Sequence, residues 1–289
     1  MKPNSFEYVR AQSLDEVLAV LSERGDEARI LAGGQSLIPS MNMRVAAPEV
    51  LIDVSGIADM QGIQILDRVL RIGAMSRQVD VHNSPAVVEH APLIAKAMPN
   101  IAHATIRNRG TFGGSLCNAD PASELPACAL ALEARFNIQS ASGSRTVAAG
   151  EFFQGTYTTC LAEDEVLVSV DLPVAMPGTW TFFDEVARRA GDYPMAGLAA
   201  QAIVHDKHLA GVRLVFFAVA EVAISAPTAE KVLSSAPIAK IDAEMVCKAV
   251  ADDIVPFDDL TTSGAAKTVI MQTLIRRALV SLAAHGGAS

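Results

Sequence analysis

The feature that most constrains this chain is a polar, glycine-containing run in the middle of an otherwise apolar sequence. The run reads TIRNRGTFGGSLCNADPASELP and covers residues 105–126. It combines glycines, hydroxyls, amides and carboxylates, and is therefore too polar for a core strand. Hydrophobic residues make up 51% of the chain and charged residues 19%, so the 289 residues are expected to bury a large core. The fold has to place this polar run where its side chains find partners.

The polar run contains the pair Gly113-Gly114, and an earlier pair, Gly33-Gly34, follows a predicted strand over residues 29–32. Paired glycines let backbone N–H groups converge, and neighbouring hydroxyls such as Thr111 and Ser115 add donors, which suits phosphate oxygens. An isolated glycine pair is usually a plain turn. The chain has neither GxGxxG after a strand nor GxxxxGK[ST], so Rossmann and P-loop sites are not indicated. Phosphate binding and plain turns both remain open from the spacing.

Three acceptors, Asn118, Asp120 and Glu124, follow the second glycine pair within ten residues. Carboxylates beside a phosphate site would suit the hydroxyls of a sugar-alcohol chain, but Asp120 equally fits a turn and Glu124 a helix start. For Arg107 and Arg109 we favour solvated or structural salt-bridge roles over phosphate contacts. The sequence shows no Ser/His/Asp or Cys/His grouping of the kind used in nucleophilic catalysis, and no evident acid–base pair. Any chemistry at this site would therefore come from a bound ligand.

Composition disfavours several classes of protein. A formal charge of −9 and a pI near 5.1 argue against nucleic-acid binding. No apolar run reaches the roughly eighteen residues of a transmembrane segment, and the first ten residues lack the apolar core of a signal peptide, so we expect a soluble cytoplasmic protein. The four cysteines have no CxxC spacing and the six histidines are dispersed. We therefore expect reduced thiols and no metal site.

Periodicity predicts an α+β architecture with a larger amino-terminal part. A capping box at Ser13 and Glu16 opens a helix that ends at Gly25. Further predicted elements are strands over 49–56, 69–75 and 164–173, helices over 85–98 and 125–132, and a hairpin around Gly143. The Pro/Gly-containing segment 174–180 indicates a domain boundary. Beyond it we predict three antiparallel strands over 181–189, 196–205 and 209–221, and helices over 242–254 and 265–285.

Together these motifs resemble the FAD-binding medium subunit of the molybdenum hydroxylases, the xanthine dehydrogenase and carbon monoxide dehydrogenase family. AGGQSLIPSMNMR (32–44) is similar to the first flavin motif of that family, the polar run to the second, and FFDEVARRAGDYPMAG (182–197) to the segment that opens its carboxy-terminal domain. The resemblance implies a two-lobed FAD-binding domain of the vanillyl-alcohol-oxidase type over residues 1–176, with lobes of about 1–57 and 58–176. A CO-dehydrogenase-flavoprotein-like domain with a three-stranded antiparallel sheet and a helical bundle would occupy 177–289.

The same resemblance implies FAD-binding residues and no catalytic or metal-ligating ones. Residues 32–36 would cradle the pyrophosphate, residues 111–115 would form a second phosphate contact, and acceptors after them would face ribityl or adenosine hydroxyls. Apolar residues would line the isoalloxazine ring and an aromatic ring would lie over it. The implied set is Leu31, Ala32, Gly33, Gly34, Gln35, Ser36, Leu37, Ile101, Thr111, Gly113, Gly114, Ser115, Asn118, Asp120, Glu124, Leu167 and Tyr193.

The function implied is that of an electron-transfer subunit in a heterotrimer that forms dimers. A large subunit with the molybdenum cofactor would oxidise an N-heteroaromatic, purine, aldehyde or CO substrate, and two [2Fe–2S] clusters on a small subunit would pass electrons to FAD and an external acceptor. The alternatives are a self-sufficient flavin-dependent oxidase or dehydrogenase, and a non-enzymatic assembly protein with an empty flavin fold. A mean hydropathy of +0.30 fits either large subunit interfaces or an alanine-rich core.

Overall fold

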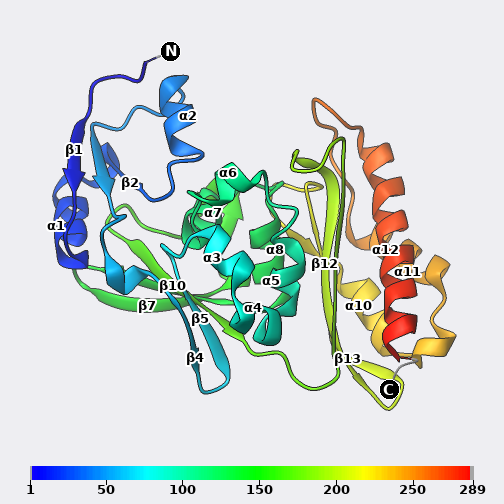
Figure 1. The fold of residues 1–289 in the computed structure, drawn as a ribbon. Helices are drawn as coiled ribbons and strands as arrows, with labels where there is room; N and C mark the ends of the chain where they lie inside the picture. The colour runs from blue at the N-terminus through cyan, green and yellow to red at the C-terminus, as the bar shows by residue number, and fades with distance from the viewer. Residues whose placement is uncertain (1, 287–289) are drawn as a thin grey trace.

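The computed structural model describes residues 2–286, and three main sheets follow one another along the chain (Figure 1). The amino-terminal sheet, blue in Figure 1, is parallel and has the order β1-β3-β2. Its elements are β1 (Glu7–Arg10), α1 (Leu14–Arg24), η1 (Gly25–Glu27), β2 (Ala28–Leu31), α2 (Leu37–Asn42) and β3 (Val50–Asp53). Because β2 ends where the first glycine pair begins, this sheet fixes the start of the first motif.

Helix α1 begins and ends as its sequence predicts. The Ser13 side chain accepts a hydrogen bond from the backbone N–H of Glu16, and the Glu16 carboxylate accepts from the backbone N–H of Gln12. Gly25 ends the helix with a φ of 46°, a conformation that glycine adopts without steric cost. Val17, Leu18 and Leu21 are buried along one face, so α1 packs through its apolar stripe.

The central sheet is antiparallel, with the order β4-β5-β10-β6-β7. Its strands are β4 (Ile63–Leu66), β5 (Val69–Gly73), β6 (Arg135–Ser140), β7 (Gly143–Ala148) and β10 (Val166–Pro173). The predicted hairpin at Gly143 is confirmed, since Ser140 pairs with Gly143 across a two-residue loop. A short hairpin of β8 (Phe153–Gly155) and β9 (Thr158–Thr159) lies between β7 and β10 in the sequence.

Short helices and turns follow β3, β5 and β7. They are η2 (Ala58–Met60), α3 (Gln78–Asn83), α4 (Pro85–His90), α5 (Pro92–Ala97), α6 (Ala104–Arg107), α7 (Phe112–Asn118), α8 (Glu124–Ala131) and α9 (Ala149–Phe152). The prediction of a single helix over 85–98 was wrong, because Pro92 cannot donate a backbone hydrogen bond and the chain breaks at Ala91. The polar run, residues 105–126, is folded into α6, α7 and the start of α8, which are joined by short bends.

The carboxy-terminal sheet has the order β11-β12-β13-β14 and is antiparallel. Its strands are β11 (Thr179–Ala187), β12 (Pro194–His205), β13 (His208–Phe217) and β14 (Ile224–Ser225). The three long strands are those predicted, and the two-residue β14 adds a fourth strand that the prediction lacked. Helices α10 (Pro227–Ser234), α11 (Ala243–Asp253) and α12 (Gly264–Gly286) follow, with the turn η3 (Ile238–Lys240) between the first two.

This last sheet is buried on both faces. Leu198 and Ala200 of β12 join the core formed with α10, α11 and α12, whereas Ala199 between them joins the core of the preceding domain. Helices α5 and α8 contact the inner face of the sheet and α12 contacts its outer face (Figure 1). In residues 2–286, no helix combines the length and apolarity that spanning a bilayer needs.

Candidate functional site

A cavity of about 760 Å³ lies where the three main sheets approach one another. Its walls come from the segment after β2, the segment 110–124, the segment before β10, and the loop between β11 and β12. Cofactor and ligand cavities in proteins typically measure about 300–1,000 Å³. The cavity is therefore large enough for a sizeable ligand, and both glycine motifs reach it.

The first glycine pair leaves a row of free backbone donors in the cavity wall. Gly34 has a φ of 71°, a conformation that a side chain disfavours, and the Gln35 side chain folds back to donate to the Gly33 carbonyl at 3.1 Å. Within residues 2–286, the backbone N–H groups of residues 33–36 donate no hydrogen bond. Converging N–H groups without partners form a concavity suited to an anion.

The second glycine pair differs from the predicted turn, because it lies in the first turn of α7. The Thr111 hydroxyl caps this helix and accepts from the Gly114 N–H at 3.1 Å. The Gly113 N–H donates to the Ala74 carbonyl at 2.8 Å and the Ser115 N–H to the Thr111 carbonyl at 3.2 Å. These backbone donors already have partners, so the second motif is left with hydroxyl protons to offer a ligand.

The two motifs are in direct contact with each other. A Cβ added to Gly33 would lie 2.5 Å from the Arg109 carbonyl oxygen, and one added to Gly114 would lie 3.4 Å from the Ala32 Cβ. The absence of a side chain at Gly33 therefore lets the two loops pack together.

Acidic side chains line the part of the cavity beyond α7. Asp120 and Glu124 are each 7% exposed. Asp120 Oδ1 accepts from the Ala122 N–H at 2.9 Å, and the Tyr157 hydroxyl donates to Asp120 Oδ2 at 3.2 Å. A buried carboxylate beside a phenol and a backbone donor is a strong acceptor site for ligand hydroxyls.

Burial sets the protonation of two glutamates at this end. Burial, with a smaller contribution from the nearby Asp120 charge, raises the pKa of Glu124 to about 7 against hydrogen bonds that lower it. Burial likewise raises the pKa of Glu185 on β11 to about 8, with the charges of Glu124 and Asp184 contributing. Near pH 7 a substantial share of both carboxyls is therefore protonated. Protonation reduces the repulsion between two acids that lie in the same partly buried region.

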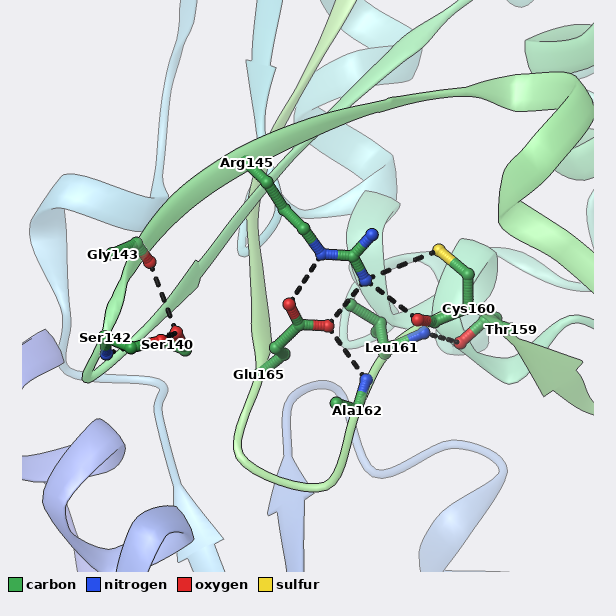
Figure 2. A network of polar contacts seen from close by, with 9 residues as sticks. All are labelled: Ser140, Ser142, Gly143, Arg145, Thr159, Cys160, Leu161, Ala162 and Glu165. Carbon is green, nitrogen blue, oxygen red and sulfur yellow. Dashed lines mark hydrogen bonds and ion pairs between the residues drawn. The ribbon is translucent and has the colours of Figure 1, made fainter.

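An ion pair holds the loop between β9 and β10 against β7 (Figure 2). Arg145 donates from Nε to Glu165 Oε1 at 2.6 Å and from Nη2 to Oε2 at 2.7 Å, and Nη2 also donates to the Cys160 carbonyl at 2.9 Å. The Ala162 N–H donates to Glu165 Oε2 at 2.8 Å. This bidentate pair lowers the pKa of Glu165 and fixes a loop whose residues Leu161 and Ala162 line the cavity.

Tyr193 lies in the loop between β11 and β12, at the edge of the cavity. The side chain is 71% exposed, and its pKa is raised to about 12 by partial desolvation and by the nearby Asp120. In the same loop, Gly191 has a φ of 81° and packs against His103 and Ala102. The carboxy-terminal sheet thus contributes an aromatic ring to a cavity otherwise built by the preceding sheets.

The structure brings nearly all the residues implied by the resemblance to this cavity. Leu31 is the exception, since it lies on β2 behind the first glycine pair, with its Cδ1 3.2 Å from a Cβ built on Gly34. Arg107 has a structural role, but through backbone carbonyls and not through the salt bridge that we favoured, because its guanidinium donates to the carbonyls of Ile101 and Ala102 at 2.7 and 2.9 Å. The lining residues are Ala32, Gly33, Gly34, Gln35, Ser36, Leu37, Ile101, Thr111, Gly113, Gly114, Ser115, Asn118, Asp120, Glu124, Leu167 and Tyr193.

Several lining residues carry no recognisable sequence signal. Gln78 lies at the start of α3, Tyr157 between β8 and β9, and Glu165 just before β10. None belongs to a glycine motif, and each reaches the cavity only through tertiary packing.

The features of the cavity fit a dinucleotide. Unpartnered N–H groups suit a diphosphate, buried carboxyls suit sugar hydroxyls, and the apolar Ile101 and Leu167 suit a flat ring. In the described residues 2–286, no group of three or more His, Cys, Asp or Glu side chains is arranged to hold a metal ion.

Comparison with known proteins identifies two family models along the chain. Residues 4–175 match the FAD binding domain in molybdopterin dehydrogenase, and residues 181–282 match the CO dehydrogenase flavoprotein C-terminal domain. The chain is 36% identical to the nicotine 6-hydroxylase medium subunit of Paenarthrobacter nicotinovorans, over 99% of this chain and 100% of that protein. It is 35% identical to the carbon monoxide dehydrogenase medium chain of Hydrogenophaga pseudoflava, over 96% and 97%.

Solved structures of related enzymes also match the chain over nearly its whole length. A carbon monoxide dehydrogenase structure from Hydrogenophaga pseudoflava, lacking the Mo-pyranopterin moiety of its molybdenum cofactor, matches with a TM-score of 0.95 and 36% identity over 99% of both chains. Quinoline 2-oxidoreductase from Pseudomonas putida 86 matches with a TM-score of 0.93 and 33% identity, again over 99% of both chains. The likeness therefore extends over the whole fold and includes every wall of the cavity.

Proposed function

Because this chain belongs to the family of FAD-binding medium subunits of the molybdenum hydroxylases, we propose that it is the electron-transfer subunit of such an oxidoreductase complex. Electrons released at a molybdenum cofactor on a large subunit would pass two [2Fe–2S] clusters on a small subunit, reach FAD on this chain, and leave to an external acceptor. The observation that carries the proposal is the cavity of about 760 Å³ with its row of free backbone donors.

In this proposal the chain binds and shields FAD and performs no acid–base step. The N–H groups of residues 33–36 and the hydroxyls of Thr111 and Ser115 bind the diphosphate. Asp120 and Glu124 accept from sugar hydroxyls, Ile101 and Leu167 exclude water from the ring, and Tyr193 covers its accessible side. Bound FAD supplies the ability to accept and release electrons.

The domain limits and partners belong to the same proposal. We place the FAD-binding domain at 1–176, with lobes of about 1–57 and 58–176, and the second domain at 177–289; the gap between the matched segments, from 175 to 181, supports this division. We propose a dimer of heterotrimers in the cytoplasm. Exposed apolar side chains such as Val45 and Leu260 support burial against partner subunits.

A spectroscopic experiment tests the proposal and separates it from its alternatives. The purified chain should bind one FAD, visible as flavin absorption, and N-heteroaromatic, purine, aldehyde or CO substrates should leave this flavin oxidised. Adding the large and small subunits should then allow one substrate class to bleach it. Bleaching of the isolated chain would favour the self-sufficient oxidase, for which Glu124 is a candidate base. Failure to take up FAD at all would favour the assembly protein.

A further inference from the structure

Tyr157 is an aromatic side chain of the cavity wall that belongs to neither glycine motif. It lies in the two-residue loop that joins β8 to β9, where Gly155 pairs with Thr158. Tyr157 is 61% exposed, so most of it faces open space and not the core. Its hydroxyl nevertheless donates to Asp120 Oδ2 at 3.2 Å, and Asp120 is only 7% exposed. The phenol therefore reaches from the edge of the cavity to a carboxylate that also lines it.

The backbone conformation at Tyr157 is unusual for a tyrosine. Its φ is 55°, in the left-handed region that glycine adopts freely and a bulky side chain rarely adopts. Hairpin loops of two residues usually place glycine or asparagine in this region. A residue in a sparsely populated conformation persists only where its surroundings fix it, and such residues cluster at binding sites. The loop geometry alone therefore does not account for a tyrosine at this position.

Hydrogen bonds on both sides of the loop hold Tyr157 beside the polar run. The Tyr157 N–H donates to the Ala119 carbonyl at 3.0 Å, so its backbone and its hydroxyl bind adjacent residues. The Thr156 hydroxyl donates to the Glu221 carbonyl at 3.3 Å, in the connection between β13 and β14. Partial desolvation and the Asp120 charge raise the pKa of Tyr157. The phenol therefore keeps its proton at neutral pH and remains a donor to Asp120.

We propose that Tyr157 is a positioning residue that holds the Asp120 carboxylate in the orientation that accepts a sugar hydroxyl of FAD. The inference rests on the proposed function, because it requires FAD in this cavity. The Ala122 N–H binds Oδ1 at 2.9 Å and the Tyr157 hydroxyl binds Oδ2, so two donors fix the plane of the carboxylate. Each oxygen can accept a further hydrogen bond. An acceptor that is already oriented binds a ligand more tightly than one that must be ordered on binding.

The test compares two Tyr→Phe substitutions that remove the same kind of contact. Tyr157→Phe keeps the ring and removes only the donor to Asp120. Tyr8→Phe is the matched control, because the Tyr8 hydroxyl donates to Asp53, Tyr8 is 53% exposed, and both residues lie outside the cavity lining. Apoprotein of the full chain is titrated with FAD by flavin fluorescence, and urea unfolding is followed without ligand. We expect the Kd for FAD to rise about tenfold in Tyr157→Phe alone, with small and similar losses of unfolding free energy in both variants.

A double-mutant cycle separates positioning from direct contact with FAD. Asp120→Ala removes both carboxylate oxygens and should weaken FAD binding more than Tyr157→Phe does. Because the phenol acts through Asp120, adding Tyr157→Phe to Asp120→Ala should not raise the Kd further. Asp120→Leu, which is closer to aspartate in volume, takes the place of Asp120→Ala in the cycle if circular dichroism shows that the alanine variant has lost helical content.

Three results would overturn the inference. The first is an unchanged Kd for FAD in Tyr157→Phe. The second is an equal loss of affinity from Tyr157→Phe with and without the Asp120 carboxylate, because the phenol would then contact FAD itself. The third is a loss of unfolding free energy in Tyr157→Phe that far exceeds the loss in Tyr8→Phe and matches the loss of affinity, because the residue would then be structural. Failure of the unmodified chain to bind FAD is a separate result, which refutes the proposed function and this inference with it.

Discussion

At the residue scale, the glycines of the first motif matter because two loops touch there. Gly33→Ala would place a Cβ 2.5 Å from the Arg109 carbonyl oxygen and 2.8 Å from the Gly110 Cα. Both are backbone atoms, so the loops must separate. We expect FAD retention to fall at least about tenfold with helical content unchanged, measured by flavin absorbance and circular dichroism. Gly150→Ala, whose nearest neighbour would be 4.0 Å away, is the control. Full FAD occupancy in Gly33→Ala would contradict the contact described.

The raised pKa of Glu185 predicts how the stability of the folded chain depends on pH. Burial raises its pKa from 4.5 to about 8, so the folded chain holds a proton that the unfolded chain releases. Stability from this group is complete below pH 4.5 and is lost as the pH rises through about 8. Glu185→Gln should therefore be more stable than the unmodified chain at pH 8.5 and equal to it near pH 4, in urea unfolding of the full chain. The exposed Glu151→Gln should show no such crossover.

The sequence predicted the cavity residues that lie in short recognisable motifs. It did not predict those that reach the cavity only through contacts between distant segments. Gly33, Asp120 and Tyr193 lie in recognisable motifs, and all three line the cavity. Gln78 does not, since only the pairing of its segment with the second motif brings it there. The helical conformation of Gly113-Gly114 was missed for a related reason. A glycine pair disfavours a helix by intrinsic propensity, but Thr111 caps it and Ala74 leaves no room for a side chain.

At the element scale, the loop between β9 and β10 depends on one ion pair, and the chain contains a matched control. Arg145 pairs with Glu165 beside the cavity, and Arg71 pairs with Asp171 in the same bidentate geometry on the same sheet, outside the cavity lining. The two arginine side chains are 45% and 41% exposed. Screening by solvent at such sites limits each pair to about 1 kcal/mol of stability.

Arg145→Met and Arg71→Met should therefore lower the unfolding free energy by similar small amounts. Only Arg145→Met should weaken FAD binding, several-fold, because it releases Leu161 and Ala162 from the cavity wall (Figure 2). Fluorescence titration with FAD, alongside urea unfolding, measures both effects. Equal FAD affinity in the two variants would show that the loop keeps its position without the pair.

The elements themselves were predictable where one period dominates. Strands β11, β12 and β13 and helix α12 follow their apolar patterns closely. The break between α4 and α5 was underestimated, although Pro92 marks it. Strand β13 was predicted to run to 221, but it ends at Phe217 because Ala218 turns with a φ of 61°. The Ala218 carbonyl at this turn accepts a hydrogen bond from Lys267 Nζ, a contact between distant residues that no local pattern reveals.

At the scale of the whole molecule, Lys267 joins the carboxy-terminal helix to the cavity. Its side chain is 0% exposed, and Nζ donates to Asp259 Oδ2 and to the Ala218 carbonyl, each at 2.7 Å. The Ala218 N–H in turn donates to the Pro121 carbonyl at 2.8 Å, next to Asp120 in the cavity wall. Helix α12 is therefore linked to the second motif through two successive hydrogen bonds, of which the one from Ala218 to Pro121 joins the carboxy-terminal sheet to the polar run.

Removal of one partner from a buried ion pair typically costs about 3–5 kcal/mol, because the other charge is left unpaired. For Lys267→Met we expect a loss near the lower limit, since the Asp259 side chain is 34% exposed and gains water. The exposed Lys248→Met is the control, and Lys267→Met/Asp259→Asn should recover part of the loss in urea unfolding. FAD retention should also fall in Lys267→Met, although this residue lines no part of the cavity. Normal FAD retention together with a lower unfolding free energy would contradict this prediction. It would show that Lys267 stabilises the carboxy-terminal sheet and helices, and that the hydrogen bonds through Ala218 have no effect on FAD binding.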